Sequence, residues 1–260
     1  ALLERDTLPR VHTIEGDTVV ILRGVNHAEG AEPEDMLSLR LAVSRARVLS
    51  IELERLRPVD RMIRRFREGR APDSPGAFVT ELVEALRLDV EPVLDELEAD
   101  VTALERRMLA RRERLDEGDR ARLVDTRQDA IQLNRYVSPQ SEALGTLVTL
   151  RPDWLTSARR LRAEAHAFGR IASDLQSVRD RARLVAEEAS LAITERTNRI
   201  ILLLSAVSVV FLPITALTGL LGVNLAGIPY ADAPWAFWAF TGVVAAAAAF
   251  AAWLARRLLR

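Results

Sequence analysis

Two long stretches without a charged residue, close together near the end of the chain, constrain this sequence more than any other feature. The first runs from about Ile200 to Leu221 and the second from about Trp235 to Leu254. Each is close to the ~20 apolar residues that an α-helix needs to cross the hydrocarbon layer of a membrane. The chain of 260 residues therefore combines two predicted membrane spans with a preceding part that is large enough for its own core.

The charges that flank the two spans predict their orientation. Arg196 and Arg199 precede the first span, and Arg256, Arg257 and Arg260 follow the second, whereas the connecting loop has no Arg or Lys. Positive charges next to membrane helices stay on the cytoplasmic side. We therefore expect both ends of the chain to be cytoplasmic and the connecting loop to face outward.

The first part of the chain has the alternating pattern of strands. Between residues 11 and 55, runs at 18–22, 37–43 and 47–53 are rich in β-formers or alternate apolar and polar side chains, and the segment 26–34 between the first two reads as a loop. These runs predict a small sheet with one buried face.

From Pro58 onward the apolar period becomes that of helices. A short basic helix is predicted over 58–67, and a long helix is predicted to begin at Pro75 with Ser74 as its cap. Gly118 marks the predicted turn into a second long helix that runs back along the first. Together with the sheet, these helices predict an α+β domain.

A third long helix is predicted to continue into the first membrane span. It begins near Asp153 or Thr156, and the next proline is Pro213. Over 157–221 such a helix would be roughly 97 Å long at 1.5 Å per residue. Its apolar residues step by 4, 3, 4, 3, 4 and 3 positions: Ile171, Leu175, Val178, Ala182, Val185, Ala189 and Ala192. This is the spacing of a coiled-coil seam, which predicts that several copies of this stalk bundle around one axis.

Small and mostly polar residues continue this spacing of three and four positions into the first predicted membrane span. We call this set the polar stripe: Asn198, Ile201, Ser205, Ser208, Leu212, Thr215 and Gly219, with Gly222 at the next step. A face of this kind either packs against another membrane helix or lines a wet path, and the spacing alone leaves both open. If copies bundle around one axis, the stripe faces inward and becomes the predicted pore lining. Ile201, Leu204 and Leu212 could then form an apolar constriction.

The residue types exclude several classes of site. The chain has no Cys, and His12, His27 and His166 do not pair at the spacing of zinc ligands, so we predict no tight zinc site. There is no Gly-x-x-x-x-Gly-Lys motif and no catalytic constellation. The sequence therefore predicts neither an enzyme nor a nucleic-acid-binding protein, and no cofactor.

The end of the first span resembles a known family. Residues 211–224 read FLPITALTGLLGVN, which is similar to the end of the first membrane helix in CorA-type metal-ion transporters, the two-transmembrane Gly-x-Asn superfamily. Val223 stands where magnesium channels of the CorA branch usually have Met. The sequences LAGIP at 225–229, GVN at 24–26 and PEDM at 33–36 look like the ZntB zinc-transporter branch.

The resemblance implies a homopentameric funnel in the cell inner membrane. Gly222, Val223 and Asn224 would ring its outer mouth, where the Asn224 carboxamide oxygens present neutral dipoles to a hydrated cation. Asp232 would make the outer loop electronegative, unless it is simply a solvated loop residue.

The expected division of the chain follows from the same resemblance. Its parts are a cytoplasmic α/β domain with projecting antiparallel helices (1–152), a stalk helix that continues into the first transmembrane helix (153–221), a periplasmic loop with the Gly-Val-Asn signature (222–234), and a second transmembrane helix with a basic cytoplasmic C-terminus (235–260).

The function that the resemblance implies is transport of divalent cations across the lipid bilayer: Zn²⁺, with Co²⁺, Ni²⁺ or Cd²⁺ as further substrates, and with proton coupling. Zinc rests on the resemblance, since no Cys or His ligand set supports it. Two alternatives stay open. One is a Mg²⁺/Co²⁺ channel of the CorA type, and the other is a membrane-anchored coiled-coil scaffold or sensor that transports nothing.

Overall fold

The computed structural model of this chain describes residues 7–14, 16–111, 115–156, 158–221 and 233–258. Its backbone forms two compact units: unit 1 is Ala1–Ala189 and unit 2 is Ser190–Arg260. The boundary between the units falls inside one long helix, so the elements of each unit are described separately below.

The sheet of unit 1 has four antiparallel strands in the order in which they follow in the sequence. They are β1 (Arg10–Ile14), β2 (Asp17–Gly24), β3 (Leu37–Val43) and β4 (Val48–Glu52). The predicted small sheet is confirmed. On the helix-facing side of the two central strands, alternate residues enter the core: Val20, Leu22, Leu39, Leu41 and Val43.

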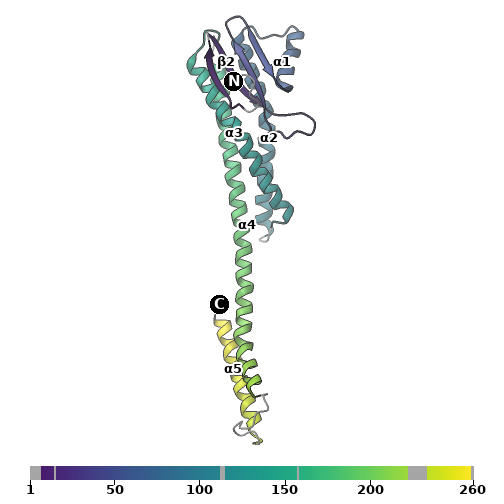
Figure 1. Cartoon of the computed structure of the whole chain (residues 1–260), viewed down its shortest axis with the longest axis vertical. Helices are drawn as coiled ribbons and strands as arrows, with labels where there is room; N and C mark the ends of the chain where they lie inside the picture. Colours follow the sequence, from purple (N-terminus) through teal and green to yellow (C-terminus); the bar gives the residue numbers. More distant parts are fainter. Residues whose placement is uncertain (1–6, 15, 112–114, 157, 222–232, 259–260) are drawn as a thin grey trace. The chain divides into compact units, whose positions relative to one another are not determined.

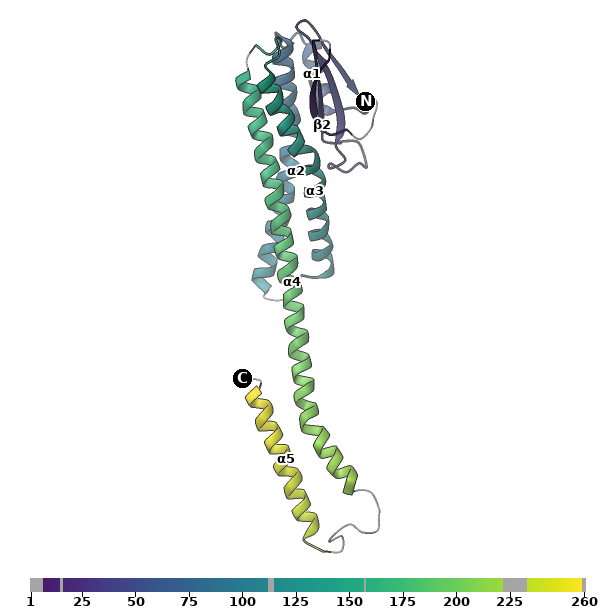
Figure 2. The ribbon, with the colours of Figure 1, turned by 60° about the vertical axis from the view of Figure 1, so that its left-hand side comes forward.

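The helices that follow the sheet in the described residues are α1 (Arg57–Arg67), α2 (Pro75–Arg111), α3 (Glu117–Leu150), α4 (Ala158–Leu221) and α5 (Ala236–Leu258). Figures 1 and 2 show their courses. The long helices that the sequence predicted are confirmed. Ser74 caps α2 as expected, since its Oγ accepts a hydrogen bond from the backbone N–H of Ala77 at 3.2 Å.

The predicted turn at Gly118 is wrong, because Gly118 lies inside the first turn of α3. Asp116 is the N-cap instead, and its Oδ1 accepts a hydrogen bond from the N–H of Asp119 at 2.7 Å. A carboxylate at this position satisfies an otherwise unpaired N–H and interacts favourably with the positive end of the helix.

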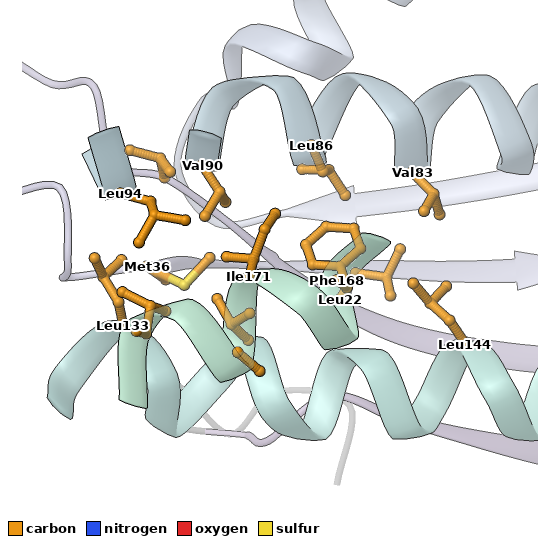
Figure 3. Packing of buried hydrophobic residues seen from close by; sticks show 14 of the residues in the cluster. Leu22, Met36, Val83, Leu86, Val90, Leu94, Leu133, Leu144, Phe168 and Ile171 are labelled. Atoms are coloured by element: carbon orange, nitrogen blue, oxygen red, sulfur yellow. The ribbon is translucent and has the colours of Figure 1, made fainter. Parts of the chain in front are cut away.

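The core of unit 1 lies between the sheet and three helices that run side by side (Figure 3). Phe168 on α4 is fully buried and lies among leucines of α2 and α3. Figure 3 shows side chains from α2 (Val83, Leu86, Val90 and Leu94), α3 (Leu133 and Leu144) and α4 (Phe168 and Ile171) meeting in one layer with Leu22 of the sheet. Burial of this layer is the main stabilisation of the unit.

The predicted coiled-coil seam is buried within the chain itself. Its members from Ile171 to Val185 are buried in the same cluster as residues of α2 and α3. Ala192, at the end of the series, is exposed. The expectation that this seam joins different copies is therefore corrected. Heptad spacing indicates that a stripe of residues is buried, but it does not indicate which helix covers the stripe.

Unit 2 consists of the last part of α4 and of α5, which runs beside it in the opposite direction in both views (Figures 1 and 2). Among the described residues, one helix is long and apolar enough to cross a membrane, the α4 stretch within Ala158–Ala216, and none of its apolar window is buried. Ala236–Phe250 in α5 is a shorter apolar helix by the same criterion.

Candidate functional site: a polar stripe on α4

The structure places all seven residues of the polar stripe on one continuous helix, α4. Each of them is exposed, and Leu212 keeps 70% of its surface accessible. At roughly 100° per residue, their steps of three and four residues keep them within one face of the helix. Unit 2 therefore leaves this face uncovered.

The opposite face of the same helix is the less exposed one, although none of its residues is fully buried. Ala206, Val210 and Ile214 are the partly buried residues between 200 and 216, and their fourfold spacing defines a line. This line lies roughly 180° around the helix from the middle of the stripe. On α5, the partly buried residues also follow helical spacing, with Phe240 and Val244 among them. On both helices these lines are the partly buried side, and the polar stripe lies outside them.

Two hydroxyl groups in this region, those of Ser208 and Thr218, donate to carbonyls of their own helix. Ser208 Oγ donates to the carbonyl of Leu204 at 2.9 Å, and Thr218 Oγ1 donates to the carbonyl of Ile214 at 2.9 Å. A hydroxyl that donates to the preceding turn is compatible with an apolar environment and still has lone pairs available. Such oxygens can accept hydrogen bonds from the water around a cation.

Pro213 lies inside α4 without ending it. Because proline has no N–H, the carbonyl of Val209, four residues earlier, loses its usual helical donor. Figure 2 shows α4 bending in its last turns. The sequence therefore provides one weakened point in the helix, next to Leu212 of the stripe.

Four predicted site residues lie outside the described residues: Gly222, Val223, Asn224 and Asp232. The mouth of the expected conduit thus remains a prediction from the sequence.

In the part of the chain that the structure describes, no group of three or more His, Asp or Glu side chains is arranged to hold a metal ion. His12 and His166 are exposed. His27 Nε2 lies 3.3 Å from Asp89 Oδ2, a contact between a loop and α2.

The fold and this site define a class of protein: a sheet-and-helix domain whose last helix continues as an apolar helix with an uncovered polar face. The chain belongs to the CorA family, since the model of the "CorA-like Mg2+ transporter protein" family matches residues 1–257. It is thus a divalent-cation transporter of that family.

Two relatives have similar sequences over almost the whole chain. The divalent cation transporter CmaX of Pseudomonas aeruginosa is 33% identical over 260 residues, which cover 99% of this chain and 78% of the relative. The zinc transport protein ZntB of Pectobacterium atrosepticum is 29% identical over 259 residues, with the same coverage of 99% and 78%.

Solved structures agree with the family. The full-length CmaX structure has a TM-score of 0.82 at 33% identity and covers 100% of this chain and 80% of that chain. The complete CorA magnesium transporter of Methanocaldococcus jannaschii also has a TM-score of 0.82, over 98% of this chain and 80% of that chain, but its identity of 16% supports the fold alone.

Proposed function

We propose that copies of this chain assemble in the inner membrane, as a pentamer, into a conduit for Zn²⁺ lined by the polar stripe of α4. The observation that carries the proposal is the division of α4 into two faces. Three residues on the back are partly buried within the chain, whereas the residues of the polar stripe are all exposed. A polar face is costly against lipid, and copies that turn it toward one axis would remove it from the acyl chains.

The proposed topology has two spans, the last part of α4 and α5. The cytoplasmic side holds unit 1 and the basic C-terminus, in agreement with the arginines on the inner flanks of both spans. In this arrangement the loop 222–234 faces the periplasm. Gly222, Val223 and Asn224 then form the outer mouth, and Asp232 attracts cations toward it.

Zinc is the proposed substrate because relatives named as zinc transport proteins match nearly the full chain. Co²⁺, Ni²⁺ and Cd²⁺ are expected to follow the same path, since they resemble Zn²⁺ in charge and ligand preference more closely than Mg²⁺ does. We further propose that a proton gradient drives uptake.

A second candidate is a Mg²⁺/Co²⁺ channel. The name of the matching family model favours it, as does the CmaX relative, whose name specifies only a divalent cation. Val223 in place of Met and the Gly-Ile-Pro sequence at 227–229 are the features of this chain that argue against it.

The test is cation uptake into proteoliposomes that contain the full chain, with Zn²⁺ and Mg²⁺ compared at equal gradients and with or without an inward proton gradient. The proposal expects faster Zn²⁺ uptake that the proton gradient increases. Faster Mg²⁺ uptake would favour the second candidate.

Asn224→Ala tests the proposed mouth. We expect this variant to lose at least about tenfold in uptake, because it removes the carboxamide ring. Asn198→Ala, at the other end of the stripe, is the matched control and should lose less. Unchanged flux in Asn224→Ala would contradict the role of the mouth, and a complete absence of flux in the parent protein would favour the scaffold or sensor alternative.

A further inference from the structure

A cleft of about 620 Å³ lies at one end of the sheet, within unit 1. Three segments line it: residues 13 and 16–18 at the turn between β1 and β2, residues 44–46 at the turn between β3 and β4, and residues 150–154 in the connection from α3 to α4. The two turns lie at the same end because the strands are antiparallel and in sequential order. We call this site the end cleft, and its volume is in the range of pockets that hold small molecules.

The segments around the end cleft are held together by buried contacts. Trp154 Nε1 donates a hydrogen bond to Thr18 Oγ1 at 3.0 Å, and both residues are buried. This bond fixes the connection between α3 and α4 to β2. The connection itself is a tight turn, since the N–H of Leu155 donates to the carbonyl of Pro152 at 2.8 Å. Binding of a ligand therefore does not have to order these segments, which lowers its entropic cost.

Arg151, which lines the end cleft, has a backbone conformation that arginine rarely adopts. Its φ of 44° and ψ of 58° lie in the left-handed region, and among the described residues it is the one residue other than glycine with a positive φ. It ends α3 at a position where glycine is the most common residue, because a side chain there is strained. An arginine is thus present beside a cleft at a position that suits glycine better, and strain of this kind points to a use of the side chain.

Four charged side chains line the end cleft, and two of them neutralise each other. Arg45 at the turn between β3 and β4 forms an ion pair with Asp153 in the connection. The side chains of Asp17 and Arg151 form no ion pair or hydrogen bond in the part of the chain that the structure describes. The end cleft therefore offers a ligand one uncommitted anion and one uncommitted cation.

A ligand that matches this lining carries both kinds of charge. A carboxylate suits the Arg151 guanidinium, which can donate two parallel N–H bonds to it, and an ammonium group suits the Asp17 carboxylate. Leu150, Pro152 and Trp154 add apolar surface to the lining, which suits an aliphatic side chain. A ligand with a single charge would leave one of the two charged groups without a partner.

We propose that the end cleft binds a small zwitterion, an α-amino acid or a short peptide with apolar side chains, whose carboxylate pairs with Arg151 and whose ammonium group pairs with Asp17. A multiply charged anion such as phosphate would need both arginines, but Arg45 is already paired with Asp153. The site belongs to unit 1 and does not depend on the proposed transport.

The test is isothermal titration calorimetry on the full chain in detergent at neutral pH. The zwitterionic probes are L-leucine and leucyl-leucine, and their counterparts with a single charge are isocaproate, which has only the carboxylate, and isoamylamine, which has only the ammonium group. We expect a Kd of about 1 mM or lower for a zwitterion. Both counterparts should bind at least about tenfold more weakly. Tighter binding of L-leucine would identify free amino acids as the ligands, tighter binding of leucyl-leucine would identify short peptides, and either result supports the site.

Three variants separate ligand binding from folding. Arg151→Gly should not lower the Tm, because glycine suits the positive φ, whereas the Kd for L-leucine should rise by at least about tenfold. Asp17→Asn should weaken the binding of L-leucine and leave that of isocaproate unchanged, because isocaproate has no ammonium group. Arg47→Gln is the matched control and should change neither, since Arg47 is exposed next to the same turn and is not among the residues that line the end cleft.

The proposal is overturned if none of the four probes gives saturable binding, or if isocaproate or isoamylamine binds as tightly as L-leucine. It is also overturned if Arg151→Gly binds L-leucine as tightly as the parent protein does, since the strained arginine would then have no part in the site. Arg151→Gln repeats the test with a residue that keeps a long polar side chain, so that poor folding of one variant, detected by circular dichroism, does not decide the result.

Discussion

At the scale of single residues, the closest approach of backbone to backbone explains why Gly76 is a glycine. A Cβ on Gly76 would lie 2.8 Å from the carbonyl oxygen of Trp154, in the connection between α3 and α4. A Cβ on Gly24 would meet Leu56 and Leu86 at the same distance, but there the contacts are ends of flexible side chains. A side chain at residue 76 would therefore require the backbone to shift, whereas one at residue 24 would require only two leucine side chains to move.

We predict that Gly76→Ala lowers the free energy of unfolding by about 2 kcal/mol, because the start of α2 must shift away from the connection. Gly24→Ala should cost less, since the two leucines can change rotamer. Thermal unfolding of both variants in detergent measures the difference, and a larger loss for Gly24→Ala would contradict the structure.

Asp129 gives a pH-dependent prediction on the stability of the whole protein. The folded protein holds this proton more tightly than the unfolded chain, so the free energy of unfolding decreases as the pH rises from about 3.8 to about 6 and stays lower above that range. Asp129→Asn removes this loss. The variant should have a higher apparent Tm than the parent protein at about pH 7.5 and a similar one near pH 4.

Glu105 is the control of opposite sign. The hydrogen bond from Arg181 lowers the pKa of Glu105, so this carboxylate stabilises the fold at neutral pH and loses its effect as the pH falls below its ordinary value of 4.5. Glu105→Gln should therefore reduce the apparent Tm at neutral pH and have little effect in acid. If both variants changed the Tm in the same direction at neutral pH, the assigned charges would be wrong.

At the scale of elements, ion pairs fix how α4 lies along α2. Arg160 pairs with Glu84, Arg87 with Glu164, and Arg181 with Glu105, over sequence separations of 76, 77 and 76 residues. A nearly constant separation means that the two helices run in the same direction and in one register. A shift of α4 by one turn would break all three pairs together.

The Arg87–Glu164 pair is the least exposed of the three, with 16% and 14% of the side chains accessible. We predict that Arg87→Met destabilises unit 1 by about 1–2 kcal/mol, because Glu164 is left partly buried without its partner. Arg183→Met is the matched control on α4, since its pair with Glu187 is exposed and within the helix. Chemical unfolding followed by circular dichroism compares them, and equal effects would count against the register.

Periodicity predicted the elements well and their partners poorly. The alternation at 37–43 and the cap at Ser74 are local signals, and the structure reproduces both. The spacing at Ile171–Val185 predicts contacts between copies. In the structure these residues are buried in one cluster with residues of α2 and α3 of the same chain. Which helix covers a stripe depends on the tertiary fold, and single-sequence spacing does not contain that information.

The candidate site shows the same limit. The stripe on α4 could be located from spacing alone, whereas its uncovered state depends on where α5 packs. The proximity of Glu34 to Asp129 has no signal in the sequence, since 95 positions separate the two residues and the PEDM resemblance at 33–36 does not point to α3. In physical terms, the proximity of carboxyl groups that are far apart in the sequence leaves no local pattern.

At the scale of the whole molecule, the account depends on one proposed arrangement, in which several chains turn the polar stripe of α4 toward a common wet axis. Within one chain the described residues of the stripe are exposed, whereas Ala206, Val210 and Ile214 on the other side of the helix are partly buried. The arrangement therefore predicts opposite chemical accessibility for two faces of a single helix.

The most direct measurement is the effect of a charged, membrane-impermeant thiol reagent on cation uptake by single-cysteine variants in proteoliposomes. Ser208→Cys places the thiol on the stripe, and Val210→Cys places it on the partly buried opposite face of α4, in a chain that has no other cysteine. We predict that the reagent reacts with the cysteine at 208 and blocks uptake, and that uptake through the variant at 210 continues. Equal block of both variants, or block only at 210, would contradict the central claim.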